Sequence, residues 1–185
     1  MTLSFKEDHI SQIPALMMLE KVGYTYLTPA EAMELRGGNT SNVLLEPILR
    51  EQLAKINTVQ VSSQCTTVFS EQNITAGIEA LRNLPMAEGF MTASQVAYDL
   101  LTAGKTLEQI VDGDKKSYVM QYIDWKHIEN NAFHVTEEFA VSRTGMSDRY
   151  RPDIVLFVNG IPLCVIECKR PDIKDSLKQA ISQQL

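Results

Sequence analysis

The sequence has few cysteines and no long apolar stretch. Its three cysteines, Cys65, Cys164 and Cys168, cannot all pair with one another, and none of them belongs to a C-x-x-C metal motif. We therefore expect neither a disulfide framework nor a zinc site, and the reducing cytoplasm is the simplest location. No run approaches the ~20 apolar residues of a membrane span. The charged residues at positions 6–8 stand where a signal peptide needs an apolar run.

An overall excess of positive charge is also absent. The 185 residues include 17 Lys and Arg against 23 Asp and Glu, which gives a net charge of −6. This balance excludes a protein that coats nucleic acid by general basicity, but it leaves a local basic site open. Hydrophobic residues make up 44 % and charged residues 22 % of the chain, as in folded globular proteins. At this length we expect a single domain over residues 1–185.

The bases are concentrated in the C-terminal part of the chain. Residues 143–178 contain seven bases and five acids, whereas the residues before 143 contain ten bases and eighteen acids. A local basic excess would attract the phosphate backbone of DNA, although a chance fluctuation of charge on a solvated surface explains the same count. The candidate DNA contacts in this stretch are Arg149, Arg151, Arg170, Lys174 and Lys178.

The pattern of apolar residues predicts a mixture of helices and strands, and hence an α/β (α+β) fold. Helices are expected over 9–22, 43–56, 71–82, 94–103 and 172–185. Strands are expected over 25–28, 117–123 and 132–142, before two apolar runs over 151–158 and 161–169. The only tryptophan, Trp125, is expected in the core rather than as a platform for base stacking.

The two apolar runs are joined by Asn159-Gly160, which is a strong hairpin signal. Both runs are apolar on both faces, as in strands that are covered on both sides. Asp153, Glu167 and Lys169 lie in this apolar setting, where each unpaired charge would cost several kcal/mol. We therefore expect these three groups to satisfy one another or to hold an ion.

The length of the hairpin loop decides whether these charges meet. Side chains alternate along a strand, so Glu167 and Lys169 share one face. A two-residue loop puts Asp153 on the opposite face. A three-residue loop with a bulge, in which Phe157 pairs with Ile161, brings Asp153 to the same face. We therefore predict the three-residue loop, or another bulge with the same effect.

One acid, followed by an acid and a lysine two residues apart, suits divalent-metal chemistry on phosphate. Mg²⁺ prefers oxygen ligands and binds one or two carboxylates together with waters, and Mn²⁺ suits the same ligands. The ion can generate hydroxide from a bound water, and a lysine can stabilise the developing negative charge. A structural salt bridge between Lys169 and one acid is the alternative, but the strand–turn–strand setting favours the metal site.

At these residues the sequence resembles the PD-(D/E)XK nuclease superfamily. Pro152-Asp153 matches the first half-motif and Glu167-Cys168-Lys169 matches the second. The stretch RPDIVLFVNGIPLCVIECKRP is similar to the nuclease domain of the R (restriction, endonuclease) subunit of type I restriction enzymes. KEDHISQIPALMMLEKVGYTYL resembles the opening of those subunits. The resemblance implies a restriction-endonuclease-like core, in which helices flank a mixed sheet that contains an antiparallel hairpin.

The resemblance also implies roles for individual residues. Asp153 and Glu167 would be ligands of Mg²⁺, the backbone carbonyl of Cys168 would be a further ligand, and Lys169 would be the catalytic base or charge stabiliser. The family also has a Gln on the following helix, and Gln183 is the best candidate.

For two of these family positions, more than one residue of this chain is a candidate. Gln179 is the alternative to Gln183, and the family's matching Tyr would lie beyond residue 185. The early acid of the family corresponds to Glu7, with Asp8 next, and a solvated helix start is the alternative for both.

R subunits of this kind are longer and carry an ATP-driven motor, so we expect this chain to be the nuclease domain without that motor. TAGKT at 102–106 is no phosphate loop, because Asp99 stands where the motif needs Gly. The expected function is Mg²⁺-dependent hydrolysis of double-stranded DNA, weak or lost in the isolated fragment. The expected partners are methyltransferase and specificity subunits. A non-catalytic docking module of the same fold is the alternative, and branched or single-stranded nucleic acid is a third reading of the substrate.

Overall fold

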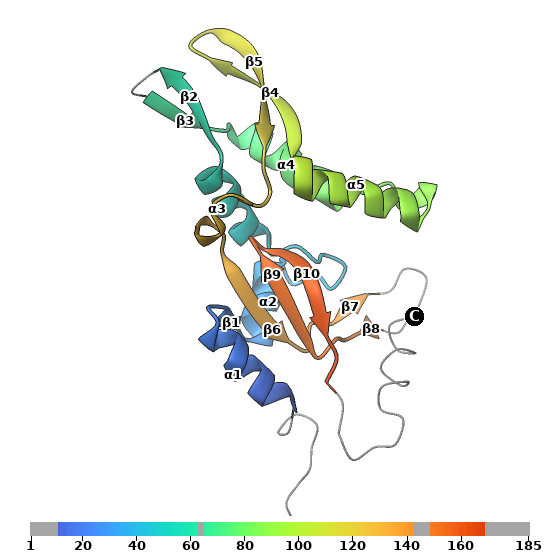
Figure 1. Ribbon diagram of the computed structural model, residues 1–185. Helices are drawn as coiled ribbons and strands as arrows, with labels where there is room; N and C mark the ends of the chain where they lie inside the picture. The colour runs from blue at the N-terminus through green and yellow to red at the C-terminus, as the bar shows by residue number, and fades with distance from the viewer. Residues whose placement is uncertain (1–10, 63–64, 143–148, 169–185) are drawn as a thin grey trace, which may run out of the picture. The chain divides into compact units, whose positions relative to one another are not determined.

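Figure 1 shows the computed structural model, which describes residues 11–62, 65–142 and 149–168. The described chain is mixed α/β and divides into two compact units. Unit 1 falls within Met1–Val43, Phe133–Phe157 and Pro162–Leu185, and unit 2 within Leu44–Ala132 and Val158–Ile161. No helix in the described ranges is long and apolar enough to cross a membrane.

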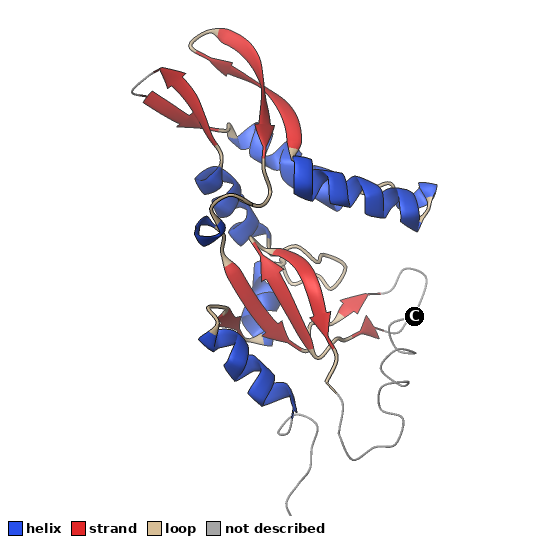
Figure 2. Cartoon of the chain, viewed as in Figure 1, coloured by secondary structure: helices blue, strands red, loops and turns tan. Residues whose placement is uncertain are grey.

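A four-stranded mixed sheet dominates unit 1, in the order β1-β6-β9-β10 (Figure 2). Its strands are β1 (Thr25–Leu27), β6 (Phe133–Glu137), β9 (Ile154–Val158) and β10 (Ile161–Ile166). β1 runs parallel to β6, with Tyr26 opposite Val135. β9 and β10 are joined by only two residues, which requires them to be antiparallel. The expected mixed sheet with a hairpin is therefore confirmed.

The turn of this hairpin differs from the prediction. β9 ends at Val158 and β10 begins at Ile161, so the loop contains only Asn159 and Gly160. Their φ angles are 52° and 80°, and left-handed backbone at both central residues is the type I′ turn that Asn-Gly favours. The predicted three-residue loop is wrong, because Asn159 itself adopts the left-handed conformation that was assigned to Gly160 alone. The turn does not decide the other form of the prediction, a bulge with the same effect elsewhere in the hairpin.

The two strands of the hairpin are covered to different degrees. β9 lies between β6 and β10, and its residues Ile154, Val155 and Phe157 are buried. β10 is at the edge of the sheet, where Leu163 and Val165 are exposed. The expectation that both faces are covered is confirmed for β9 and wrong for β10.

Helix α1 (Ile13–Lys21) packs on one face of this sheet. Its residue Leu16 is buried in a cluster with Val135, Ile154 and Cys168. Pro14 lies in the first turn of the helix, and Gly23, at φ 107°, follows its end. Burying each large aliphatic side chain contributes roughly 1.5–3 kcal/mol, so the cluster ties the helix to the central strands.

Unit 1 contains three further elements. Helix α2 (Pro29–Leu35) begins at a capping box, in which the side chains of Thr28 and Glu31 bond to each other's backbone. Strands β7 (Val141–Ser142) and β8 (Arg149–Tyr150) pair antiparallel. The sequence pattern did not predict α2, which spans only seven residues.

Unit 2 combines three helices with two hairpins. The helices are α3 (Glu46–Ile56), α4 (Glu71–Arg82) and α5 (Phe90–Ala103), and the 3-10 turns are η2 (Met86–Glu88) and η3 (Ile128–Asn130). The strands are β2 (Thr58–Ser62), β3 (Cys65–Val68), β4 (Lys105–Val111) and β5 (Asp114–Met120). Leu49 and Leu53 of α3 and Ile74 and Ile78 of α4 form its core together with Tyr122.

Trp125 is not part of this core, contrary to the expectation from the sequence. Its side chain is 56 % exposed. The indole N–H donates to the carbonyl of Leu101 at 2.9 Å. A tryptophan can contact the protein through its N–H while most of its ring stays exposed to solvent.

Candidate active site

The two half-motifs of the sequence meet at the open end of the β9–β10 hairpin. Asp153 directly precedes β9, and Glu167 and Cys168 directly follow β10. The backbone N–H of Cys168 donates to Oδ2 of Asp153 at 2.6 Å. A short hydrogen bond to a carboxylate is among the stronger kinds in proteins, so it holds Asp153 beside the second half-motif.

A tyrosine orients the second carboxylate. The hydroxyl of Tyr150, on β8, donates to Oε1 of Glu167 at 2.6 Å. Each acid therefore uses one oxygen in a short hydrogen bond. In the part of the chain that the structure describes, Oδ1 of Asp153 and Oε2 of Glu167 accept no hydrogen bond. One oxygen on each carboxylate is left for a ligand.

The packing of neighbouring residues indicates the side on which these acids lie. Ile154, Ile166 and Cys168 contribute to the same apolar cluster beneath α1. Side chains alternate along extended backbone, and Asp153 and Glu167 are each adjacent in sequence to members of that cluster. A regular two-residue hairpin would pair Ile154 with Val165 and put the two acids on opposite faces, but Ile154 and Ile166 share this cluster. The strands therefore leave that regular register before they reach the carboxylates, as the predicted alternative of another bulge requires, and alternation then directs both acids to the side away from α1.

A second network holds the backbone of Asp153 from the α1 side. Its carbonyl accepts from the N–H of Glu138 at 3.0 Å and from Nε2 of Gln12 at 3.3 Å. The same Nε2 donates to Oε2 of Glu137 at 2.9 Å, and the hydroxyl of Tyr26 donates to Oε1 of Glu137 at 2.7 Å. Burial, together with the Glu137 carboxylate, raises the pKa of Tyr26 to about 12. The network fixes the position of the first half-motif.

The sequence pattern did not single out Gln12 or Glu137 for this network. A clue was nevertheless present, because Gln12 lies four residues before the buried Leu16 and is itself only 6 % exposed. Residues four apart share one face of a helix. A polar side chain on the face that packs against the sheet must find partners there.

Arginines provide positive charge in unit 1. The guanidinium of Arg36 is buried, lies 4.2 Å from the ring centroid of Phe139, and donates to the carbonyl of Ala140 at 2.7 Å. Burial, and then the charge of Arg149, lowers its pKa from the usual value. Of the candidate DNA contacts, Arg149 and Arg151 are exposed, and Arg151 lies 3.6 Å from Glu138.

The described donors suit a hard divalent cation. Two carboxylates with a free oxygen each, and a backbone carbonyl at Cys168, form an oxygen set of the kind that Mg²⁺ prefers. Within residues 11–62, 65–142 and 149–168, no group of three or more His, Cys, Asp or Glu side chains could hold a metal. Of the described side chains, Asp153 and Glu167 would supply two ligands, and waters would add to the shell.

The remaining predicted site residues lie outside the described residues. They are Lys169, the glutamine candidates Gln183 and Gln179, the early acids Glu7 and Asp8, and the basic residues Arg170, Lys174 and Lys178.

Comparison with known proteins gives a consistent result over nearly the whole chain. The model of the family "Type I restriction enzyme R protein N terminus" matches residues 4–185. The type I restriction enzyme HindI endonuclease subunit of Haemophilus influenzae is 29 % identical over 184 residues, which cover 96 % of this chain and 16 % of that protein. Two Methanocaldococcus jannaschii proteins are also named as type I restriction enzyme endonuclease subunits. MjaIXP is 25 % identical over 95 % of this chain and 16 % of its own length, and MjaVIIIP is 31 % identical over 89 % and 14 %.

Proposed function

We propose that this chain, which belongs to the family of type I restriction enzyme R protein N-terminal regions, is a nuclease domain that hydrolyses phosphodiester bonds of double-stranded DNA with Mg²⁺. The observation that carries the proposal is the 2.6 Å hydrogen bond between Cys168 and the Asp153 carboxylate. It unites the halves of a PD-(D/E)XK motif that lie fifteen residues apart in the chain. A restriction-endonuclease-like core is part of the proposal.

In the proposed site, Asp153, Glu167 and the Cys168 carbonyl hold the ion. When bound, Mg²⁺ would supply an activated water and neutralise charge that develops on the phosphate oxygens. The Tyr150 hydroxyl keeps Glu167 in one orientation, and the Gln12 side chain does the same for the backbone of Asp153. Lys169 stabilises the developing charge or accepts the proton of the attacking water.

DNA binding would rest on the basic residues beside the carboxylates. Arg149 is exposed on β8, directly before the tyrosine that contacts Glu167. A cation one residue from the site can pair with a phosphate next to the one that is cleaved. Gln183, Glu7, Arg170, Lys174 and Lys178 are proposed to complete the catalytic and DNA-binding surface.

The chain spans about a sixth of the length of the curated relatives that it matches. We propose that an ATP-dependent motor follows it in the whole protein, and that methyltransferase and specificity subunits are its partners. Recognition of a particular DNA sequence would then belong to another subunit, and cleavage by the isolated domain would be weak.

A non-catalytic docking module is the second candidate function. The observation that favours it is an exposed apolar group at the start of α5, where Phe90 is 78 % and Met91 is 86 % exposed. Exposed apolar patches are typical of protein contact sites. Metal binding distinguishes the two candidates, because a docking module has no need of the carboxylate pair.

We expect calorimetric titration with Mn²⁺ to show a site that Asp153→Asn removes. The asparagine keeps an oxygen that can accept from the N–H of Cys168, but it loses the charge that binds the cation. Affinity should fall by at least about 10-fold, since altering even an outer partner of a metal ligand costs 10–100-fold. Asp114→Asn, at an exposed acid on β5 in unit 2, should bind like the wild type. Equal binding by wild type and Asp153→Asn would contradict the metal site.

A further inference from the structure

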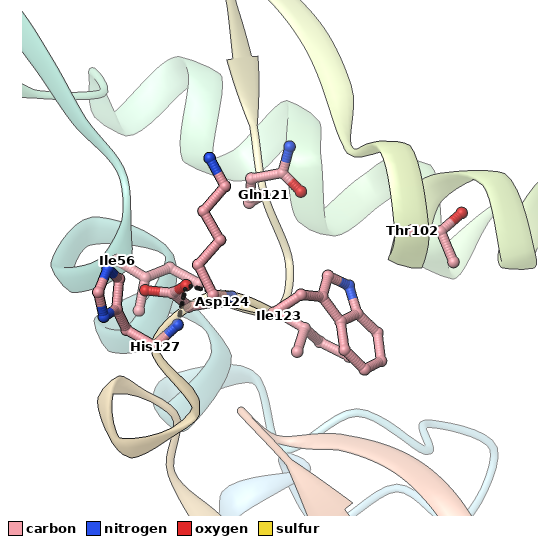
Figure 3. Close-up of a pocket in the computed structure, with 8 residues that line it drawn as sticks. Ile56, Thr102, Gln121, Ile123, Asp124 and His127 are labelled. Carbon is pink, nitrogen blue, oxygen red and sulfur yellow. Dashed lines mark hydrogen bonds between the residues drawn. The ribbon is translucent and has the colours of Figure 1, made fainter.

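Trp125 lines a pocket in unit 2, and Figure 3 shows this pocket in close-up. The pocket has a volume of about 430 Å³, within the usual range for small-ligand sites. Ile56 from the end of α3 and Ile123 give it an apolar wall, and Thr102 from the end of α5 and Gln121 add polar groups. The bond between the indole N–H and Leu101 fixes one edge of the ring.

The loop that carries Trp125 is held in one shape by Asp124. The carboxylate of Asp124 accepts from the N–H of Lys126 at 3.1 Å, from the N–H of His127 at 2.9 Å and from Nδ2 of Asn130 at 2.8 Å. These bonds, first that from Asn130, lower the pKa of Asp124. The carboxylate is therefore occupied in shaping the loop.

Two basic side chains lie along the same pocket. The ammonium group of Lys126 makes no ion pair with any described residue, and Nδ1 of His127 is 3.6 Å from Glu129. An aromatic ring and a cation that line the same pocket are the combination that binds an unpaired nucleotide, because the base stacks on the ring and the phosphate pairs with the charge. A base in duplex DNA is already stacked and paired, so its faces are not available to the ring.

We infer that this pocket binds one unpaired nucleotide of DNA, with its base stacked on Trp125 and its phosphate beside Lys126. The inference rests on the proposed function only in taking DNA as the source of the nucleotide. It places a single-strand contact on residues of unit 2, whereas the carboxylates belong to unit 1.

The fluorescence of Trp125 tests the inference directly, because it is the only tryptophan of the chain. The probe is a single-stranded oligothymidylate of eight nucleotides, titrated in EDTA so that no metal-dependent reaction takes part. We expect saturable quenching by the single strand and at least about 5-fold weaker binding of a blunt duplex of equal length. Equal quenching by both, or none by either, would overturn the inference.

Variants separate stacking from general charge attraction, with binding followed by the anisotropy of a labelled oligothymidylate. Trp125→Ala should weaken binding about 10- to 100-fold, as removal of a stacking platform does, whereas Trp125→Phe should stay within about 3-fold of wild type. Lys126→Gln should weaken binding about 3- to 10-fold and lessen its salt dependence. Its control is Lys115→Gln, at a lysine 2.5 Å from Glu108 on the β4–β5 hairpin.

The outcomes distinguish this inference from the nuclease proposal. If the single strand does not quench Trp125 but Mn²⁺ still binds at the carboxylates, the inferred nucleotide site is contradicted and the nuclease proposal is unaffected. Quenching that persists in a protein without a Mn²⁺ site would support the pocket and contradict the nuclease. If Lys126→Gln and Lys115→Gln weaken the binding of oligothymidylate equally, general charge attraction explains the binding and the inference is contradicted.

Discussion

Replacing Lys169 by alanine is expected to lower the rate of DNA cleavage by about 10²–10³-fold or more, the usual effect of removing one group that stabilises transition-state charge. In the proposed mechanism this ammonium stabilises the negative charge that develops on the phosphate. Cleavage should be measured in the full-length restriction complex with Mg²⁺, so that DNA is delivered as it is in the whole enzyme. Affinity for Mn²⁺ should be unchanged, because the carboxylates remain.

A lysine of the same unit provides the control for this variant. Lys21 is exposed in the last turn of α1. The Lys21→Ala variant should cleave DNA at the wild-type rate. Cleavage that survives in Lys169→Ala with intact Mn²⁺ binding would contradict the role proposed for this residue. Loss of both Mn²⁺ binding and the circular dichroism spectrum would instead indicate a structural role for Lys169.

Replacing Asn159 by alanine is expected to lower the free energy of unfolding by about 3–5 kcal/mol, at the upper end for single substitutions. The side chain is fully buried, and its Nδ2 donates to the carbonyl of Tyr122 at 2.9 Å and to Oδ1 of Asn131 at 2.8 Å. Its Oδ1 accepts from the N–H of Ala132 at 2.8 Å. Alanine would leave the carbonyl of Tyr122 and the N–H of Ala132 without this partner, at roughly 1–3 kcal/mol each, whereas Oδ1 of Asn131 would still accept from the N–H of Asp124. Alanine also disfavours the φ of 52°.

Guanidinium unfolding followed by circular dichroism measures this loss. Asn83→Ala is the matched control, since Asn83 donates only to the exposed Glu79 from the end of α4. It should change the free energy of unfolding by less than about 1 kcal/mol. A similar small change in Asn159→Ala would show that the turn does not depend on the buried asparagine.

Local sequence patterns predicted the elements that have strong signals of their own. The expected helix over 71–82 matches α4, which Ser70 caps by accepting from the N–H of Asn73. The hairpin at Asn159-Gly160, although not its two-residue turn, and the short strand β1 were also predicted. In the β4–β5 hairpin, the expected strand over 117–123 overlaps only the second half of β5. β4 and the turn, where Asp112 and Gly113 adopt φ angles of 52° and 84°, were missed. β5 is largely exposed and begins with three charged residues, and charged or polar residues interrupt the apolar residues of β4. Neither strand therefore has the continuous apolar run that identifies β9.

The candidate site was predicted in part, for a physical reason. Asp153, Glu167 and Cys168 belong to a contiguous hairpin, and two strands joined by a tight turn must come together. Gln12 and Glu137 are separated by 125 residues and meet only through packing of α1 on the sheet. The register argument failed at the turn, because it did not allow for a left-handed Asn159. Contacts made by tertiary packing leave little local trace in a sequence.

The central claim is that Asp153 and Glu167 hold one divalent ion between them, and anomalous X-ray diffraction from crystals grown with Mn²⁺ tests it most directly. We predict a single anomalous peak within roughly 2.0–2.3 Å of a carboxylate oxygen from each residue, near the distances of hard divalent cations to oxygen. The Asp153→Asn crystal should lose that peak. A manganese ion bound elsewhere, or carboxylates that point to opposite sides of the hairpin, would contradict the account.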